Sequence, residues 1–222
     1  MSTVLEVSHL SMHFPVRGGV FSRKKGVVKA VDNVSFSISP GETLGLVGES
    51  GCGKSTLAML VAGLYEPWEG EVLLDGAPLT ALARSTFGYM PEERGLYPKQ
   101  PILDQLVYLG QLHRMSQLQA RKGALDLLER FGLGDRTKDK LESLSLGNQQ
   151  RVQIAASLLH KPSVLILDEP FSGLDPVAVD SMVELLRERT SAGVPVLFSS
   201  HQLDLVDRLC DNLVVLKAGK VM

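Results

Sequence analysis

The order of apolar and polar positions divides the chain into three stretches. In the first, residues 4–13 and 28–38 alternate loosely and predict strands. From Pro91 to about Leu144 the apolar positions recur at helical spacing, with little strand signal. After Pro162, short apolar runs alternate with helical segments. This alternation is typical of a mostly parallel sheet covered by helices on both faces.

Local signals place the individual elements. In the middle stretch, Ser116 followed by Gln119 forms a capping box, and the helix that it opens is expected to end at Gly132. Another helix is expected to begin at Asp175-Pro176, an N-cap followed by proline. The other expected strands are 43–47, 70–76, 164–167, 194–199 and 213–217, and the other expected helices are 55–64, 104–113 and 202–210.

Two of these helices show a clear apolar face. The face of the helix after Ser116 is assigned to Ala124, Leu125, Leu128 and Phe131. The face of the helix after Asp175 is assigned to Met182, Val183, Leu185 and Leu186.

A glycine-rich segment stands between the strand 43–47 and the helix 55–64, and it fits the phosphate-loop pattern G-x-x-x-x-G-K-[S/T]. Its glycines let backbone N–H groups face phosphate oxygens at a helix N-terminus. Lys54 would reach the terminal phosphates of a nucleotide, and Ser55 would offer its hydroxyl to Mg²⁺. The alternative is a plain glycine-rich turn. The predicted nucleotide-binding residues are Gly48, Glu49, Ser50, Gly51, Cys52, Gly53, Lys54, Ser55 and Thr56.

Two acids end the apolar run 164–167. A buried strand can end in carboxylates where its edge meets a site, because an unpaired buried charge is costly. Asp168 is placed to hold Mg²⁺, directly or through water, and Glu169 is placed to orient or deprotonate an attacking water. The alternative is a strand that ends in acids at a solvated loop.

Composition limits the protein class. The 222 residues suit one large domain, or a core with an inserted lobe. With 23 basic and 25 acidic residues the net charge is −2, so no global field favours nucleic acid, and no nucleic-acid partner is expected. One basic cluster is interpreted as a solvated face, with a membrane or nucleic-acid patch as the alternative. It contains Arg17, Arg23, Lys24, Lys25 and Lys29.

The two cysteines form no disulfide framework, which favours a reducing compartment. Cys52 is interpreted as a tolerated small residue of the phosphate loop and not as a nucleophile. The N-terminus lacks a signal-peptide pattern, and no apolar run approaches the roughly 18 residues of a membrane span. We therefore expect a soluble cytoplasmic protein whose membrane connection comes through a partner.

One further segment, Leu144–Arg151, precedes the acidic strand. Together with the phosphate loop, the acids, Ser172–Asp175 and His201, it resembles the ATP-binding subunits of ABC transporters over about residues 4–220. The resemblance implies an α/β P-loop NTPase (RecA-like) core with a mostly parallel sheet, an N-terminal antiparallel β subdomain and an inserted α-helical subdomain. Within a single domain of residues 1–222, the core with its β layer would comprise residues 1–90 and 160–222, and the helical lobe with the signature motif residues 91–159.

The resemblance also assigns roles within a complex with ATP and Mg²⁺. Ser145 and Gly147 would face the γ-phosphate of ATP held by a second subunit, and the physics of a helix N-terminus agrees. Asp175 would belong to a loop that crosses the dimer interface. His201 would contact the γ-phosphate, and Phe14 would stack on adenine or, alternatively, pack in the core. The catalytic residues are then Glu169, His201 and Lys54, and the metal ligands Ser55, Asp168 and Glu92.

Three departures from the family pattern stand out. In the signature, Leu146 replaces a glycine and Asn148 a glutamine, and Glu92 replaces a glutamine after the first core strands. Residues 5–56 resemble oligopeptide-importer ATPases, whereas residues from about 85 resemble ATPases of drug or ion exporters. The mixture suggests a recombined or engineered chain with a joint near residues 57–70. Both subfamilies usually continue beyond Met222, so a C-terminal accessory region is expected to be absent.

The expected function is that of an ATP-binding and ATP-hydrolysing subunit of an ABC transporter, at the inner face of the cell membrane. Two composite MgATP sites would lie between this chain and a second ATPase subunit, either an identical copy or a related cassette. They would drive transmembrane permease subunits that dock near residues 92–97. The alternatives are a nucleotide-binding scaffold with weak or no ATPase activity, and a soluble ABC ATPase that works on DNA or ribosomes.

Overall fold

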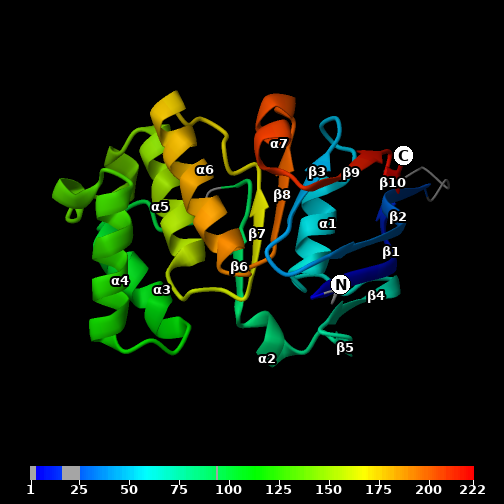
Figure 1. Ribbon diagram of the computed structural model, residues 1–222, viewed down its shortest axis with the longest axis horizontal. Helices are drawn as coiled ribbons and strands as arrows, with labels where there is room; N and C mark the ends of the chain where they lie inside the picture. Colours follow the sequence, from blue (N-terminus) through cyan, green and yellow to red (C-terminus); the bar gives the residue numbers. More distant parts are fainter. Residues whose placement is uncertain (1–3, 17–25, 94) are drawn as a thin grey trace, which may run out of the picture.

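The computed structural model describes residues 4–16, 26–93 and 95–222 (Figure 1). Two sheets and the helices around them make up this part of the chain. Of the basic cluster, Lys29 lies on a described strand, and Arg17, Arg23, Lys24 and Lys25 lie outside the described residues.

The larger sheet has six strands in the order β10-β9-β3-β8-β7-β6, and all its neighbours are parallel except the final hairpin. The central strands β7 and β8 are buried along their whole length, which explains their apolar runs. Since parallel strands share one carboxyl edge, β3, β7 and β8 deliver the segments that follow them to one side of the molecule. The strands are β3 (Thr43–Val47), β6 (Phe87–Met90), β7 (Val164–Asp168), β8 (Val196–Ser200), β9 (Asn212–Lys217) and β10 (Lys220–Val221).

The smaller sheet is antiparallel, with the order β2-β1-β4-β5. It packs on α1 (Lys54–Val61), whose buried Leu57 and Leu60 share one core with Ile38 of the small sheet and Leu197 of the large one. The helix α1 therefore lies between the two sheets (Figure 1). The strands are β1 (Leu5–Val16), β2 (Gly26–Ile38), β4 (Glu69–Leu74) and β5 (Ala77–Pro78).

The remaining helices form a second core. Three of them, α3 (Ile102–Leu112), α4 (Gln117–Arg130) and α5 (Leu146–Leu158), gather at the end of the molecule away from the small sheet (Figure 1). The capping box is confirmed, since Ser116 Oγ accepts from the Gln119 N–H and Gln119 Oε1 accepts from the Ser116 N–H. The others are α2 (Ala81–Arg84), α6 (Pro176–Ser191), α7 (Leu203–Leu209) and two 3₁₀ turns, Gly134–Arg136 and Leu141–Ser143.

The predicted fold class is confirmed: an α/β protein with a mixed, mostly parallel sheet and an antiparallel N-terminal sheet. The apolar face of α6 is buried as expected, but the prediction for α4 was wrong at Leu125, which is 38% exposed. Leu127 is buried in its place, because the buried stripe follows Ala120, Ala124, Leu127 and Leu128 at helical spacing. Among the described residues, no helix combines the length and apolar character that a membrane span requires.

Candidate nucleotide-binding site

A pocket of about 610 Å³ opens where the carboxyl edge of the large sheet meets the start of α1. It brings together most of the residues that the sequence predicts. Val28, Lys29, Ala30 and Ala218 also line it and were not predicted. The predicted residues in its lining are Ser50, Gly51, Gly53, Lys54, Ser55, Thr56, Glu92, Glu169 and His201.

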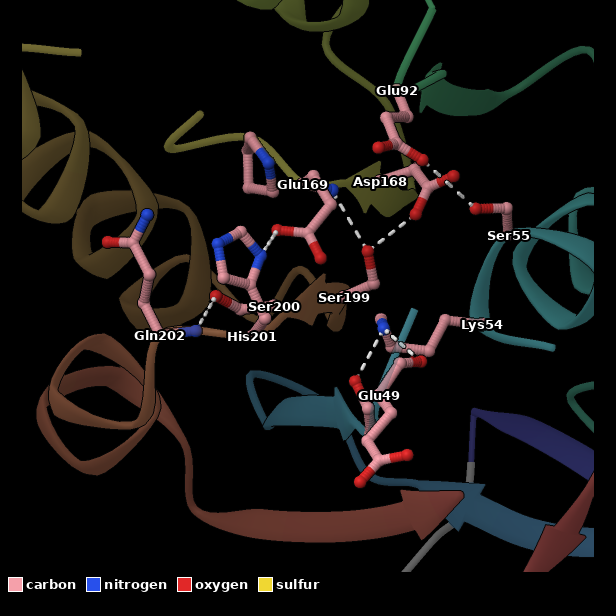
Figure 2. Close-up of polar contacts among 12 residues, drawn as sticks. Glu49, Lys54, Ser55, Glu92, Asp168, Glu169, Ser199, Ser200, His201 and Gln202 are labelled. Carbon is pink, nitrogen blue, oxygen red and sulfur yellow. Dashed lines mark hydrogen bonds and ion pairs between the residues drawn. The ribbon is translucent and has the colours of Figure 1, made fainter. Parts of the chain in front are cut away.

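The phosphate loop has the backbone that its glycines predict. Gly53, the N-cap of α1, has φ 109°, and a Cβ there would collide with the Ala30 carbonyl. Because Gly53 offers no side chain to cap α1, the first N–H groups of the helix are available to an anion. Lys54 Nζ donates to the carbonyls of Gly48 (2.7 Å) and Glu49 (3.2 Å) (Figure 2). Lys54 as a whole is only 8% exposed, and its ammonium folds back onto the loop.

Three predicted loop residues are not in the lining of this pocket. Gly48, Glu49 and Cys52 line a neighbouring pocket of about 490 Å³, together with the β9–β10 hairpin and with Ser50 and Gly51, which line both pockets. Cys52 is buried and its thiol is free, and a Cβ on Gly48 would collide with its sulfur. Lys54, Ser55 and Thr56, by contrast, line the 610 Å³ pocket and not this one.

The three predicted metal ligands come from three elements and converge (Figure 2). Ser55 Oγ on α1 lies 3.5 Å from Glu92 Oε2, which follows β6. Asp168, the last residue of β7, is 1% exposed. Its carboxylate accepts a short hydrogen bond from Ser199 Oγ on β8. Carboxylate and hydroxyl oxygens are the ligand type that Mg²⁺ prefers, and one or two carboxylates are enough when phosphates and water complete the shell. The donor set therefore fits Mg²⁺.

Glu169 has an unusual backbone conformation. Its φ is +49°, in the left-handed region, and it precedes Pro170. A non-glycine residue held there stores about 1–3 kcal/mol of strain, and such strain gathers at functional sites. The Glu169 N–H donates to Ser199 Oγ at 2.9 Å, so one buried serine contacts both acids. Ser199 was not predicted, because its contact depends on the register that sets Asp168 opposite Ser199.

His201 follows β8 and joins the site through Glu169. Its Nδ1 lies 2.9 Å from Glu169 Oε2 (Figure 2). Since a carboxylate only accepts, Nδ1 carries the proton in this contact. The histidine side chain is 63% exposed and the glutamate only 10%, so the imidazole lies at the mouth of the pocket over a buried carboxylate.

Tyr89 on β6 is a further group near the acids that the sequence did not indicate. Burial raises the pKa of its hydroxyl to about 12, and the negative charge of Asp168 acts in the same direction. The phenol is therefore neutral and can donate a hydrogen bond.

Phe14 is not part of the pocket lining. Its ring lies edge-on to Tyr65, with the centroids 6.1 Å apart. Its strand neighbour Val28 does line the pocket, so Phe14 is one strand away. Its stacking on adenine stays a prediction.

Ser145, Gly147 and Asp175 also lie outside this pocket. Ser145 is the N-cap of α5, and its Oγ accepts weakly from the Asn148 N–H at 3.4 Å. Gly147 packs against the Gly173 carbonyl, where a Cβ would come within 2.8 Å. Leu146, which replaces a signature glycine, is 60% exposed.

Asp175 has a local role in this chain. Its carboxylate accepts from the Ala178 N–H (2.9 Å) as the N-cap of α6 and pairs with Arg151 Nη2 (2.8 Å). The capping hydrogen bond and, to a lesser extent, the Arg151 charge lower the pKa of this carboxyl.

Comparison with known proteins identifies the family. The sequence model of the family described as ABC transporter matches residues 31–172, well over half of the chain. This chain belongs to that family. The ABC transporter ATP-binding protein YhaQ of Bacillus subtilis is 45% identical over 195 residues, which cover 88% of this chain and 65% of YhaQ. The chain thus spans about 65% of the length of this relative.

Two solved ABC proteins extend the likeness to structure. One is a dimeric ATP-binding cassette in a post-hydrolysis state with ADP and Pi bound; it has a TM-score of 0.86 and 26% identity over 98% of this chain and 96% of its own. The other is a component of the cbiONQ ABC transporter complex of Clostridium perfringens, with a TM-score of 0.79 and 28% identity over 100% of this chain and 88% of its own.

Proposed function

We propose that this ABC ATPase subunit binds MgATP in the 610 Å³ pocket and hydrolyses it, and that hydrolysis drives a transmembrane permease. The observation that carries the proposal is the composition of the pocket. A phosphate loop with Lys54 and Ser55 forms one part of the lining, and Glu169 with His201 forms another. Phosphate binding and water activation are thus available in the same cavity.

Binding rests on the phosphate loop. The N–H groups at the start of α1 would contact the phosphates, and Lys54 would exchange the carbonyls of Gly48 and Glu49 for phosphate oxygens. Ser55, Asp168 and Glu92 would hold Mg²⁺, which would supply positive charge to the phosphates. Phe14 would stack on the adenine ring from the neighbouring strand.

Hydrolysis rests on Glu169. The carboxylate would orient or deprotonate the attacking water, which is chemistry that depends mainly on positioning. His201, which donates to that carboxylate, would contact the γ-phosphate from the mouth of the pocket. The strained backbone of Glu169 supports this role, because such strain persists only where the surrounding structure holds it.

The site would be completed by a second chain. Ser145 and Gly147 lie at the start of α5, outside their own chain's pocket, so they would serve the γ-phosphate in the pocket of the partner. The dimeric neighbour with ADP and Pi supports this arrangement. Asp175 would then lie near the interface, and residues 91–159 would act as the signature lobe beside a core formed by residues 1–90 and 160–222.

A second cavity, of about 550 Å³, supports the permease contact. Pro91, Gly95 and Leu96 line it together with the residues just after α1 and with residues of α5. It lies beside the segment 92–97 that the sequence indicates for docking, and a membrane subunit seated there would bring the chain to the inner face of the cell membrane. The neighbour from the cbiONQ complex supports a partner of this kind.

The Glu169→Gln variant tests the proposal. It should lose turnover, keep MgATP binding and accumulate as an ATP-bound dimer, because the amide cannot activate water while the phosphate loop is unchanged. Steady-state phosphate release, nucleotide binding and light scattering with and without MgATP measure the three properties. Turnover in the variant equal to that of the unmodified chain would overturn the role of Glu169. An unmodified chain that binds MgATP and is no faster than the variant would favour the scaffold alternative.

A further inference from the structure

The backbone on both sides of the Glu169 Cα requires support. A residue before proline normally adopts an extended conformation with negative φ, because the proline ring crowds the helical region. Glu169 instead has φ +49° and precedes Pro170. Its side chain is aimed at His201 and at the pocket through this conformation. Whatever holds the two peptide groups next to Glu169 therefore sets the position of the carboxylate.

Hydrogen bonds reach both of these peptide groups. On the N-terminal side, the Glu169 N–H donates to Ser199 Oγ. On the C-terminal side, Gln150 Nε2 donates to the carbonyl of Glu169 at 3.3 Å and to that of Pro170 at 3.2 Å. The Ser172 N–H also donates to the Glu169 carbonyl, at 3.2 Å. Of these two donors, Gln150 is the one that reaches two successive peptide groups, and it comes from another element, the helix α5.

Gln150 occupies a position where an apolar residue would ordinarily pack. Its side chain is 3% exposed, and its helix also buries Val152 and Ile154 completely. A buried amide is costly unless its hydrogen bonds are made, so the two carbonyls account for its presence. The residue lies on α5 five positions after Ser145, so one helix connects the proposed partner-facing end to Glu169.

We propose that Gln150 is a positioning residue for ATP hydrolysis: its side-chain amide holds the carbonyls of Glu169 and Pro170 and thereby fixes the Glu169 carboxylate in the pocket. The inference rests on the proposed function. Gln150 does not line the pocket, and the hydrogen bonds of its side chain go to the carbonyls of Glu169 and Pro170. Its contribution is therefore to the rate of the chemical step and not to nucleotide affinity.

The test replaces Gln150 by Met, which keeps the length and helix propensity of the side chain and removes its donor. The matched control is Gln105→Met on α3, another buried glutamine whose Nε2 donates to a backbone carbonyl, that of Gln100. We expect Gln150→Met to lower kcat by about tenfold or more with KM for ATP unchanged, since displacing a reacting group by about 1 Å costs on the order of 100-fold. Gln105→Met should keep kcat.

A second readout needs no turnover. Hydrogen exchange of a peptide covering residues 168–174 should be several-fold faster in Gln150→Met than in Gln105→Met. Without the Gln150 amide, the backbone that carries the Glu169 and Ser172 N–H groups is held less firmly, so their hydrogen bonds open more often. Normal kcat, a change in KM alone, or unchanged exchange in Gln150→Met would overturn the inference. An unmodified chain no faster than Glu169→Gln would instead overturn the proposed function, and the exchange comparison would still decide whether Gln150 holds the Glu169 backbone.

Discussion

Two helices of this protein begin at segments predicted to meet phosphate, and the two starts differ. The start of α1 lies in the 610 Å³ pocket, whose lining also includes residues of β2 and residues that follow β6, β7 and β8. The start of α5 lies outside that pocket. The Ser145 hydroxyl, the N-cap of α5, accepts a weak hydrogen bond from the Asn148 N–H, and Leu146 is exposed. One chain thus contains a phosphate loop together with its acids. The start of α5, in contrast, is not part of the pocket of its own chain.

The difference indicates which chain supplies the groups that face each helix start in the proposed site. The acids that serve α1 come from the same chain, through the parallel register of β7 and β8. Ser145 does not line the 610 Å³ pocket, so in the proposed function a phosphate at the start of α5 would arrive with a second chain. The two starts should therefore respond differently to substitution: the first in nucleotide binding, the second in turnover alone.

The largest expected effect is at α1. Lys54→Ala should weaken MgATP binding and turnover together, by about 3 kcal/mol or more, because a preorganised charge on the phosphates is lost. Nucleotide titration and phosphate release measure the two losses. Lys220→Ala is the control, since this lysine pairs with Asp32 on the surface. Near-normal affinity in Lys54→Ala would contradict the assignment of α1 as the nucleotide site.

The next effect is at α5. Ser145→Arg should reduce turnover by about 100-fold, as for the loss of one preorganised donor, while MgATP affinity of the monomer stays within about twofold. Ser116→Arg removes the N-cap of α4 and is the matched control for the loss of a capping serine. If Ser145→Arg weakened nucleotide binding by the monomer as strongly as Lys54→Ala, the two helix starts would not belong to different halves of the site.

Much of this comparison could be predicted from the sequence because its signals are local. The phosphate loop, the acids after an apolar run and the capping box each lie within about ten residues. What was missed depends on contacts between distant segments. Ser199 is one of two serines at the end of an apolar strand, and only the pairing of β8 with β7 brings it to Asp168 and Glu169.

Short elements were the other failure. The strand β6 has four residues, and its Gly88 packs against the Ser157 carbonyl of α5. Its sequence therefore shows little of the apolar and polar alternation that would predict a strand. The helix α2 also has four residues, and the strand β10 has two, so neither gives a periodic signal. The proposed joint near residues 57–70 stays a hypothesis; Leu57 and Leu60 there pack into a core that both sheets share.

The smallest effect concerns Asp175, beside the start of α5. Because its pKa is lowered in the folded state, its carboxylate stabilises the fold above the unfolded pKa, and this contribution is lost as pH falls through the folded pKa. Asp175→Asn keeps a capping side chain but not the charge beside Arg151. The variant should therefore have a slightly lower Tm than the unmodified chain near neutral pH, and the difference should shrink as pH approaches about 3. A difference in Tm that does not change with pH would show that the charge contributes nothing.

The most direct test of the composite site is the specific ATPase rate as a function of protein concentration, with Glu169→Gln as the blank. If the start of α5 completes the pocket of another copy, the rate per chain should rise with concentration and level off as dimers form, and the blank should stay flat. A rate per chain that is above the blank and independent of concentration, in protein shown to be monomeric, would contradict the account, because one chain would then hydrolyse ATP alone.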